Sequence, residues 1–328
     1  MNVMQRLYER TRARRPRMVL PEASDERVRA AAVRLADEGL CQVILLGSDA
    51  RAGEALRVLD PERESDRAPL ADYLREMRRG QDPPPGREEA HRLLRDPLTF
   101  AACLVGSGGA EGAVAGAAHP TSQVIRAALR YIGMRDGISL VSSIFLMELA
   151  DGRTVTYGDC GVVPYPDEEQ LAGIARESAR SHRMLTGGEP RVAMLSFSTL
   201  GSSSHERADL VRRATERVRR DAPELAVDGE MQFDAALLPE VAEKKCPGSP
   251  VGGRATVFVF PNLDAGNIAY KITERLADAR ATGPILQGLA RSMMDLSRGC
   301  SADDIVNAAC VASVMGEGEE GGQGGIRV

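Results

Sequence analysis

RMVLPEASDERVRAAAVRLADEGLCQVILLG, at residues 17–47, is the stretch that decides the fold. A short apolar run, RMVL, is followed by a helical pattern whose first turn is acidic, as the positive end of a helix dipole favours. Gly39 marks the end of that helix, and QVILLG follows as a second short apolar run. A strand, a helix and a strand in this order predict one unit of an α/β fold with parallel strands.

The same alternation continues along the chain. EGAVAG precedes TSQVIRAALRYIG, in which Val124, Ala128 and Ile132 recur at helical spacing. ISLVSSIFLMELA, residues 138–150, is the longest apolar stretch and is typical of a fully buried strand. Further strands are expected in RTVTYGDCGV, RVAMLSFST and ATVFVF, and further helices in the segments DEEQLAGIARESARSHRML, SHERADLVRRATERVRR, FDAALLPEVAEKK, AGNIAYKITERLAD and SADDIVNAACVASVM. We therefore predict an α/β protein with largely parallel sheets.

Composition narrows the class of protein. A length of 328 residues favours two domains, and 43% hydrophobic with 27% charged residues is typical of a globular protein. The net charge of −5 gives no electrostatic support for binding nucleic acid, and no apolar run is long enough to span a membrane. The six cysteines match neither a disulfide framework nor a paired metal site, so we expect reduced thiols in a cytoplasmic protein without a metal ion.

DLSRGCSADDIVNAA, residues 295–309, has two interpretations. Ser301 and Asp304 form the pattern of a capping box at a helix N-terminus, and local grounds favour that structural role. Alternatively, Asp304 is a general base and Arg298 binds an anionic ligand in the loop before the helix. Cys300 as a nucleophile needs a nearby base, and no histidine is close to it in sequence.

Several other segments carry weaker signals. KCPGSPVGG lacks the order of a Walker loop, and GSGGAEG lacks the preceding strand of a dinucleotide fingerprint, so simple turns are the favoured interpretation. One hydroxyl of SFSTLGSSSHE suffices to cap a helix. The four histidines show no metal-like spacing, and Arg78 and Arg126 are on their own ordinary surface arginines.

Taken together and in order, these segments resemble the phosphate acetyl/butyryltransferase family. The resemblance covers almost the whole chain except the tail. It is carried by VAGAAHPTSQVIRAAL, GISLVSSIFLM, GPILQGL, DLSRGCSADDIV and the long block from DGEMQFDAALLPEVAEKKCPGSPVGG to NLDAGNIAYKI. It implies reversible transfer of an acetyl group between acetyl phosphate and coenzyme A, with phosphate as the other product. No tightly bound cofactor is implied, because coenzyme A is itself a substrate.

The resemblance also implies a fold and an assembly. Two α/β domains would enclose an interdomain cleft, as in isocitrate and isopropylmalate dehydrogenases, usually in a homodimer. The expected domains are residues 1–145 with 296–328, and residues 146–295, with a disordered tail at about 316–328. Clefts between domains are frequent ligand sites.

Residue roles follow from the matched motifs. Asp304 matches the base that takes the proton of the coenzyme A thiol, Arg298 the arginine that holds the phosphate, and Ser297 a serine that hydrogen-bonds the reacting centre. Arg78 and Arg126 match substrate-binding arginines. Cys160, in GDCGV, matches a cysteine near the active site that is not essential.

The sequence departs from the family pattern at three places. Leu200 stands where relatives commonly carry lysine, Gly161 where alanine is usual, and the segment GQDPPPGREEA after Arg78 is atypical. A butyryl or longer acyl preference and a non-catalytic acyl-CoA sensor are the alternatives to acetyl transfer. The absence of a fused dehydrogenase favours the enzyme over the sensor. A dehydrogenase is a further alternative, but the sequence contains neither an aspartate cluster for a metal nor a nucleotide-binding loop to support it.

Overall fold

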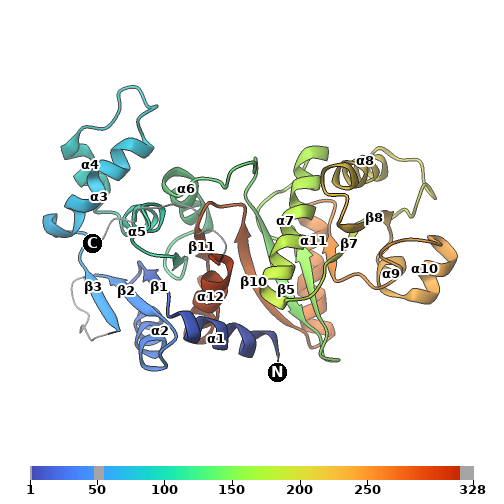
Figure 1. The fold of residues 1–328 in the computed structure, drawn as a ribbon, viewed down its shortest axis with the longest axis horizontal. Coiled ribbons are helices and arrows are strands. Elements are labelled where there is room, and N and C mark those ends of the chain that lie inside the picture. The colour runs from blue at the N-terminus through green and yellow to red at the C-terminus, as the bar shows by residue number, and fades with distance from the viewer. Residues whose placement is uncertain (1, 48–54, 318–328) are drawn as a thin grey trace. The chain divides into compact units, whose positions relative to one another are not determined.

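The computed structural model describes residues 2–47 and 55–317, and the chain divides into two compact units. Unit 1 comprises Met1–Asp136 and Leu289–Val328, and unit 2 comprises Gly137–Gly288 (Figure 1). Both are α/β, as predicted. The expectation of disorder in the tail lies, for residues 318–328, outside the described residues.

The division differs from the predicted boundaries at residues 145 and 295. A boundary at 145 would cut β5, a single strand over Ser142–Glu148 that pairs with two neighbours inside unit 2. The chain returns earlier than predicted, because the strand Ser292–Asp295 pairs with a strand of unit 1. Strand pairing therefore assigns residues 137–145 to unit 2 and residues 289–295 to unit 1.

Unit 1 is built on a five-stranded sheet in the order β11-β4-β1-β2-β3, and every pair in it is parallel. Its elements are α1 (Val3–Arg14), β1 (Arg17–Leu20), α2 (Glu26–Asp37), β2 (Gln42–Leu46), β3 (Leu56–Leu59), α3 (Glu64–Met77), α4 (Arg87–Leu93), α5 (Pro97–Gly106), β4 (Gly112–Ala115), α6 (Thr121–Tyr131), β11 (Ser292–Asp295) and α12 (Ala302–Met315).

Helices cover both faces of this sheet (Figure 1). α2 and α12 pack together on one face, and α5 and α6 pack together on the other. The opening segment forms the predicted β1, α2 and β2. Asp25 caps α2 by accepting from the Arg27 amide at 2.8 Å, and the helix buries Val28, Ala31, Ala32 and Leu35 at helical spacing. α12 is buried almost all round, as a helix in the middle of a layer must be.

Unit 2 contains a six-stranded mixed sheet in the order β10-β5-β6-β9-β7-β8. The neighbours from β6 through β9 and β7 to β8 are parallel, as expected, whereas β5 is antiparallel to both β6 and β10. Its elements are β5 (Ser142–Glu148), β6 (Thr154–Gly158), α7 (Glu168–Thr186), β7 (Arg191–Leu195), α8 (Glu206–Asp221), β8 (Ala226–Met231), α9 (Phe233–Leu237), α10 (Pro239–Lys245), β9 (Val257–Val259), α11 (Leu263–Leu276) and β10 (Arg280–Gln287).

The predicted single helix over residues 233–245 is two helices. Leu238, between α9 and α10, is extended with φ −113° and ψ 115°. The residue that follows it is Pro239, whose ring disfavours the helical conformation of the preceding residue. The proline then serves as the first residue of α10, where its missing N–H costs nothing.

Candidate functional site

The loop between β11 and α12 lies at the carboxyl edge of the unit 1 sheet and carries Ser297 and Arg298, whereas Asp304, the third predicted catalytic residue, lies in the first turn of α12. Ser297 and Arg298 are exposed in a turn closed by a 2.9 Å bond from the Cys300 amide to the Ser297 carbonyl. The Ser297 hydroxyl accepts from the Gly299 amide at 3.3 Å. Ligands of open α/β sheets bind at this edge, so the loop is placed where a ligand is expected.

The predicted capping box is present at the start of α12. The Ser301 hydroxyl accepts from the Asp304 amide at 3.2 Å, and Asp304 Oδ2 accepts from the Ser301 amide at 2.8 Å. The same Oδ2 accepts from the Ser301 hydroxyl at 2.8 Å. Both bonds to the carboxylate therefore end on Oδ2. Oδ1 of the exposed Asp304 has no hydrogen-bond partner among the described residues, so the cap leaves it open for a second role.

Arg298 has the character of an anion-binding group. Its guanidinium is exposed and forms no hydrogen bond or ion pair within residues 2–47 and 55–317. It lies directly before the N-terminus of α12, where the helix dipole and unpaired amides favour negative charge. The loop and the first turn of α12 therefore present a planar cation, Arg298, and a carboxylate, Asp304, within a stretch of seven residues.

A buried carboxylate that the sequence reasoning missed shapes the neighbouring loop. Glu22, the second residue after β1, is almost fully buried and accepts from the backbone amides of residues 116–119 at 2.9–3.2 Å. It also lies 2.6 Å from the His119 ring nitrogen Nδ1. The loop after β4 is thus folded around one side chain. An acidic residue just after a buried strand was the available signal.

Asp295, the last residue of β11, is a second missed group at this edge. Burial raises its pKa from 3.8 to about 6; the hydrogen bond from Thr121 acts against this shift, and the charge of Glu22 adds to it. Thr121 Oγ1 donates to Asp295 Oδ2 at 2.6 Å, which ties the start of α6 to the end of β11. Gly116, with φ 103°, allows this approach, because a Cβ there would lie 2.6 Å from Asp295 Oδ1.

The two predicted substrate-binding arginines lie elsewhere in unit 1. Arg126 is exposed in α6, the helix that Thr121 joins to β11. Arg78 caps the C-terminus of α3, which packs against α5 and α6, and its Nε is buried without a hydrogen-bond partner among the described residues. Their meeting with Arg298 on one substrate stays a prediction.

Neither cysteine of interest has the environment of a nucleophile. Burial raises the pKa of the Cys300 thiol, and although Arg27 lowers it, Asp304 and other carboxylates raise it further. In unit 2, burial raises the pKa of Cys160 well above its ordinary value, with the charge of Asp159 adding to the effect. Both thiols therefore stay protonated near neutral pH, which disfavours nucleophilic attack by either.

The carboxyl edge of unit 2 has its own loops. Asp159 is buried and accepts from the amides of Ser143, Gly161 and Val163 at 3.1, 3.0 and 2.8 Å, which fixes the loop around Cys160. Leu200, the departure from lysine, lies in an exposed loop at φ 45°, and its amide donates to the Glu230 carbonyl at 2.9 Å.

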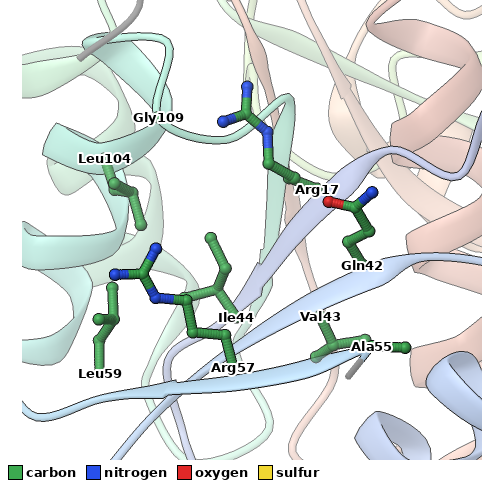
Figure 2. A pocket seen from close by; sticks show the side chains of 9 residues that line it. All are labelled: Arg17, Gln42, Val43, Ile44, Ala55, Arg57, Leu59, Leu104 and Gly109. Atoms are coloured by element: carbon green, nitrogen blue, oxygen red, sulfur yellow. The ribbon is translucent and has the colours of Figure 1, made fainter. Parts of the chain in front are cut away.

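A pocket of about 180 Å³ in unit 1 lies away from these residues (Figure 2). It is lined by the first residues of β1 and β2 and by residues along β3, and the guanidinium groups of Arg17 and Arg57 lie in its wall. Ile44, Leu59 and Leu104 form its apolar wall. None of the predicted site residues lines it.

In residues 2–47 and 55–317, no group of three or more His, Cys, Asp or Glu side chains is arranged to hold a metal ion. Over the same ranges, no helix has the length and apolar character that crossing a bilayer requires.

A two-domain α/β chain with an exposed arginine and a helix-capping carboxylate at the carboxyl edge of a parallel sheet defines a class that binds anionic ligands. Within that class, the chain belongs to the phosphate acetyl/butaryl transferase family, whose model matches residues 2–313. It is 46% identical to the phosphate acetyltransferase of Paracoccus denitrificans over 322 residues, 96% of this chain and 99% of that one. The corresponding enzyme of Acetivibrio thermocellus is 42% identical over 330 residues, 97% of this chain and 99% of that one. A solved phosphotransacetylase from Streptococcus pyogenes superposes with a TM-score of 0.90 at 39% identity, covering 96% of this chain and 98% of that one.

Proposed function

We propose that this chain is a phosphate acetyltransferase, an acyltransferase that moves an acetyl group reversibly between acetyl phosphate and coenzyme A. The observation that supports it best is the exposed, unpaired guanidinium of Arg298 beside Asp304 at the start of α12, in a chain whose full-length relatives bear that name. Phosphate groups suit this place, because guanidinium binds them through two parallel hydrogen bonds.

The proposed reaction is a direct transfer in a ternary complex. Oδ1 of Asp304 takes the proton of the coenzyme A thiol, which is mostly protonated at neutral pH because its pKa is about 8.5. The thiolate forms a bond to the acetyl carbon, and the bond from that carbon to the phosphate oxygen breaks. The phosphate leaves with the electron pair and is held by Arg298, while Ser297 donates a hydrogen bond to the carbonyl oxygen as charge develops there.

Acetyl phosphate is already an activated acyl donor, so positioning and charge neutralisation suffice for the transfer. We accordingly propose that no cofactor is tightly bound and that Arg78 and Arg126 bind the phosphates of coenzyme A or of acetyl phosphate. Full activity after dialysis against a chelator is expected; a loss that a divalent metal restores would contradict the absence of a metal requirement.

The decisive assay follows thioester formation from acetyl phosphate and coenzyme A. The wild type is expected to turn over acetyl phosphate faster than butyryl phosphate, and Arg298→Ala to lose activity about 10²–10³-fold, the usual effect of removing one preorganised charge-stabilising group. Arg153→Ala is the matched control, since Arg153 is an exposed arginine in a turn of unit 2 that pairs with Asp151. Acetyl-CoA binding without turnover would instead indicate a sensor, and faster butyryl transfer a butyryltransferase.

A homodimer is part of the proposal, and α11 is the surface that supports it. Ile268, Ile272 and Leu276 recur every fourth residue and are 57%, 51% and 83% exposed. Such an apolar stripe on a helix surface marks an interaction site, and a second copy presents the same stripe across a twofold axis. Ile272→Glu is expected to sediment as a monomer, whereas Val33→Glu, at an exposed position of α2, is expected to stay dimeric like the wild type. Wild type that sediments as a monomer would contradict the dimer.

We also place the enzyme in the cytoplasm. All six cysteines are free and buried, as in proteins of a reducing compartment. Recovery of the native protein with a disulfide would contradict this location. The cleft between the two domains stays a prediction.

A further inference from the structure

Arg27, at the start of α2, makes a hydrogen bond with every N–H group of its guanidinium. Nε donates to Asp25 Oδ1 at 3.0 Å, and Nη2 donates to Asp25 Oδ2 at 2.7 Å and to the Ala117 carbonyl at 3.0 Å. Nη1 donates to the carbonyls of Arg298 and Cys300 at 2.8 and 2.7 Å. A guanidinium has five N–H donors, so none is left for a ligand in this arrangement.

These acceptors come from three loops at the carboxyl edge of one sheet. Asp25 follows β1, Ala117 follows β4, and Arg298 with Cys300 follows β11. One side chain therefore connects the start of α2 to the loop before α6 and to the loop before α12. The two bonds to carbonyls of the last loop hold the backbone of the turn that carries the Arg298 side chain.

Arg27 and Arg298 differ in whether their guanidinium groups are already hydrogen-bonded within the protein. The Arg298 guanidinium is exposed and has no partner in the described chain, whereas that of Arg27 is half-buried and fully bonded. Of these two, only Arg298 can bind a phosphate without breaking protein contacts. A catalytic charge acts fully only if it is already in place when the reaction begins, and a free loop would have to be ordered first.

We propose that Arg27 is a positioning residue for the acyl transfer, holding the backbone of residues 298–300 so that Arg298 is fixed relative to Asp304. This inference rests on the proposed function. It assigns to Arg27 an effect on turnover through Arg298, and no contact with coenzyme A or phosphate.

The kinetic test is a double-mutant cycle. Arg27→Ala is expected to lower kcat about 10–100-fold, as misplacement of a catalytic group does, with KM for coenzyme A within about threefold of the wild type. In an Arg298→Ala background the same substitution should lower kcat less than about threefold, because the group it positions is gone. Equal losses in both backgrounds, or a raised KM for coenzyme A at unchanged kcat, would overturn the proposal.

The matched control is on the same helix. The Arg29 guanidinium also donates to carbonyls, those of Ala23 and Ser24 at 2.6 and 3.1 Å, but these belong to the loop before α2 alone. Arg29→Ala should leave kcat unchanged. Arg27→Lys covers the case in which the alanine variant does not fold: it keeps the charge but lacks the forked set of five donors. Full activity of Arg27→Lys would show that charge alone suffices and would overturn the proposal that the five hydrogen bonds of Arg27 hold residues 298–300.

Hydrogen exchange separates this inference from the proposed function. The Cys300 amide is bonded within the turn, and its exchange should accelerate in Arg27→Ala but not in Arg29→Ala. If the wild type fails to transfer acetyl groups, accelerated exchange still supports the positioning role while the proposed function fails. If the wild type is active but Arg27→Ala changes neither the exchange nor kcat, the positioning role fails alone.

Discussion

The loop after β11 in unit 1 and the loop after β6 in unit 2 are held by side chains of opposite charge. In unit 1 a cation, Arg27, collects the carbonyls of the loop after β11, and the side chains of Ser297 and Arg298 remain exposed. In unit 2 an anion, Asp159, collects the amides of the loop after β6, and the neighbouring Cys160 is fully buried.

This difference indicates where chemistry is available. A loop held by a separate side chain leaves its own polar groups open to a ligand, as Arg298 is. The loop that Asp159 holds encloses Cys160. Burial raises the pKa of this thiol well above its ordinary value, so the thiol is protonated and not exposed to a ligand. Unit 1 therefore supplies the reacting groups of the proposed site.

The largest effect is expected at the capping box of α12, in unit 1. Asp304→Asn and Asp304→Ala should each lower kcat about 10²–10⁴-fold, since both remove the proposed general base. Ser301→Ala should destabilise the start of α12 by about 1 kcal/mol but keep the base, so activity is largely retained. Steady-state kinetics with a thermal melt of each variant give the comparison.

Unit 2 contains the matching control for this prediction. α7 begins with a capping box in which the Asp167 amide donates to Gln170 at 3.0 Å and the Gln170 amide to Asp167 at 2.8 Å. Asp167→Ala removes an equivalent cap and should leave kcat unchanged. Near-normal turnover in Asp304→Asn would show that Asp304 only caps α12 and is not the base.

An intermediate effect is expected on the pH dependence of unit 1. The folded state raises the pKa of Asp295 from 3.8 to about 6, so between these values it binds more protons than the unfolded state. The stability that this group contributes is present at low pH and is lost as the pH rises toward 6. The difference of about two pKa units corresponds to about 3 kcal/mol.

Asp295→Asn removes this titration. Relative to the wild type, the variant should therefore gain up to about 3 kcal/mol between pH 4 and pH 7. Hydrogen exchange of the β4 amides measures the change in unit 1, and the β7 amides of unit 2 are the internal control. If the β4 amides of the variant and the wild type exchange at the same relative rates at both pH values, Asp295 is not the group that titrates.

How far the sequence predicts the structure differs between apolar and polar segments. β1, α2 and β2 form where hydrophobic spacing places them, since burial of one face dominates the local choice. β8 was missed because its sequence, AVDGEM, is polar: Asp228 is buried against Arg219, and Glu230 accepts from Ser198 at 2.9 Å. The residues that bond these two carboxylates are distant in sequence, so the local pattern of residues does not reveal that the carboxylates can be buried.

The same reason limits prediction of the site. The capping box of Ser301 and Asp304 is local and was predicted from spacing alone. The role of Arg27 depends on carbonyls 90 and more than 270 residues away in sequence, and main-chain acceptors have no sequence signature. The boundary at residue 145 was wrong for a related reason, because strand pairing rather than apolar character decides to which unit β5 belongs.

The smallest effects are expected at the two cysteines, which complete the comparison of the loops. Cys300→Ala should retain kcat within about threefold, because Arg27 binds the carbonyl of residue 300 whatever its side chain. Cys160→Ala should also remain active but lose about 1 kcal/mol or more of stability, since its thiol is fully enclosed and deletion leaves a cavity. Enzyme assays and denaturant melts of both variants test this. A loss in Cys300→Ala as large as that in Asp304→Asn would restore the thiol as a nucleophile, whereas activity in both variants leaves the exposed carboxylate and guanidinium of unit 1 as the reacting groups.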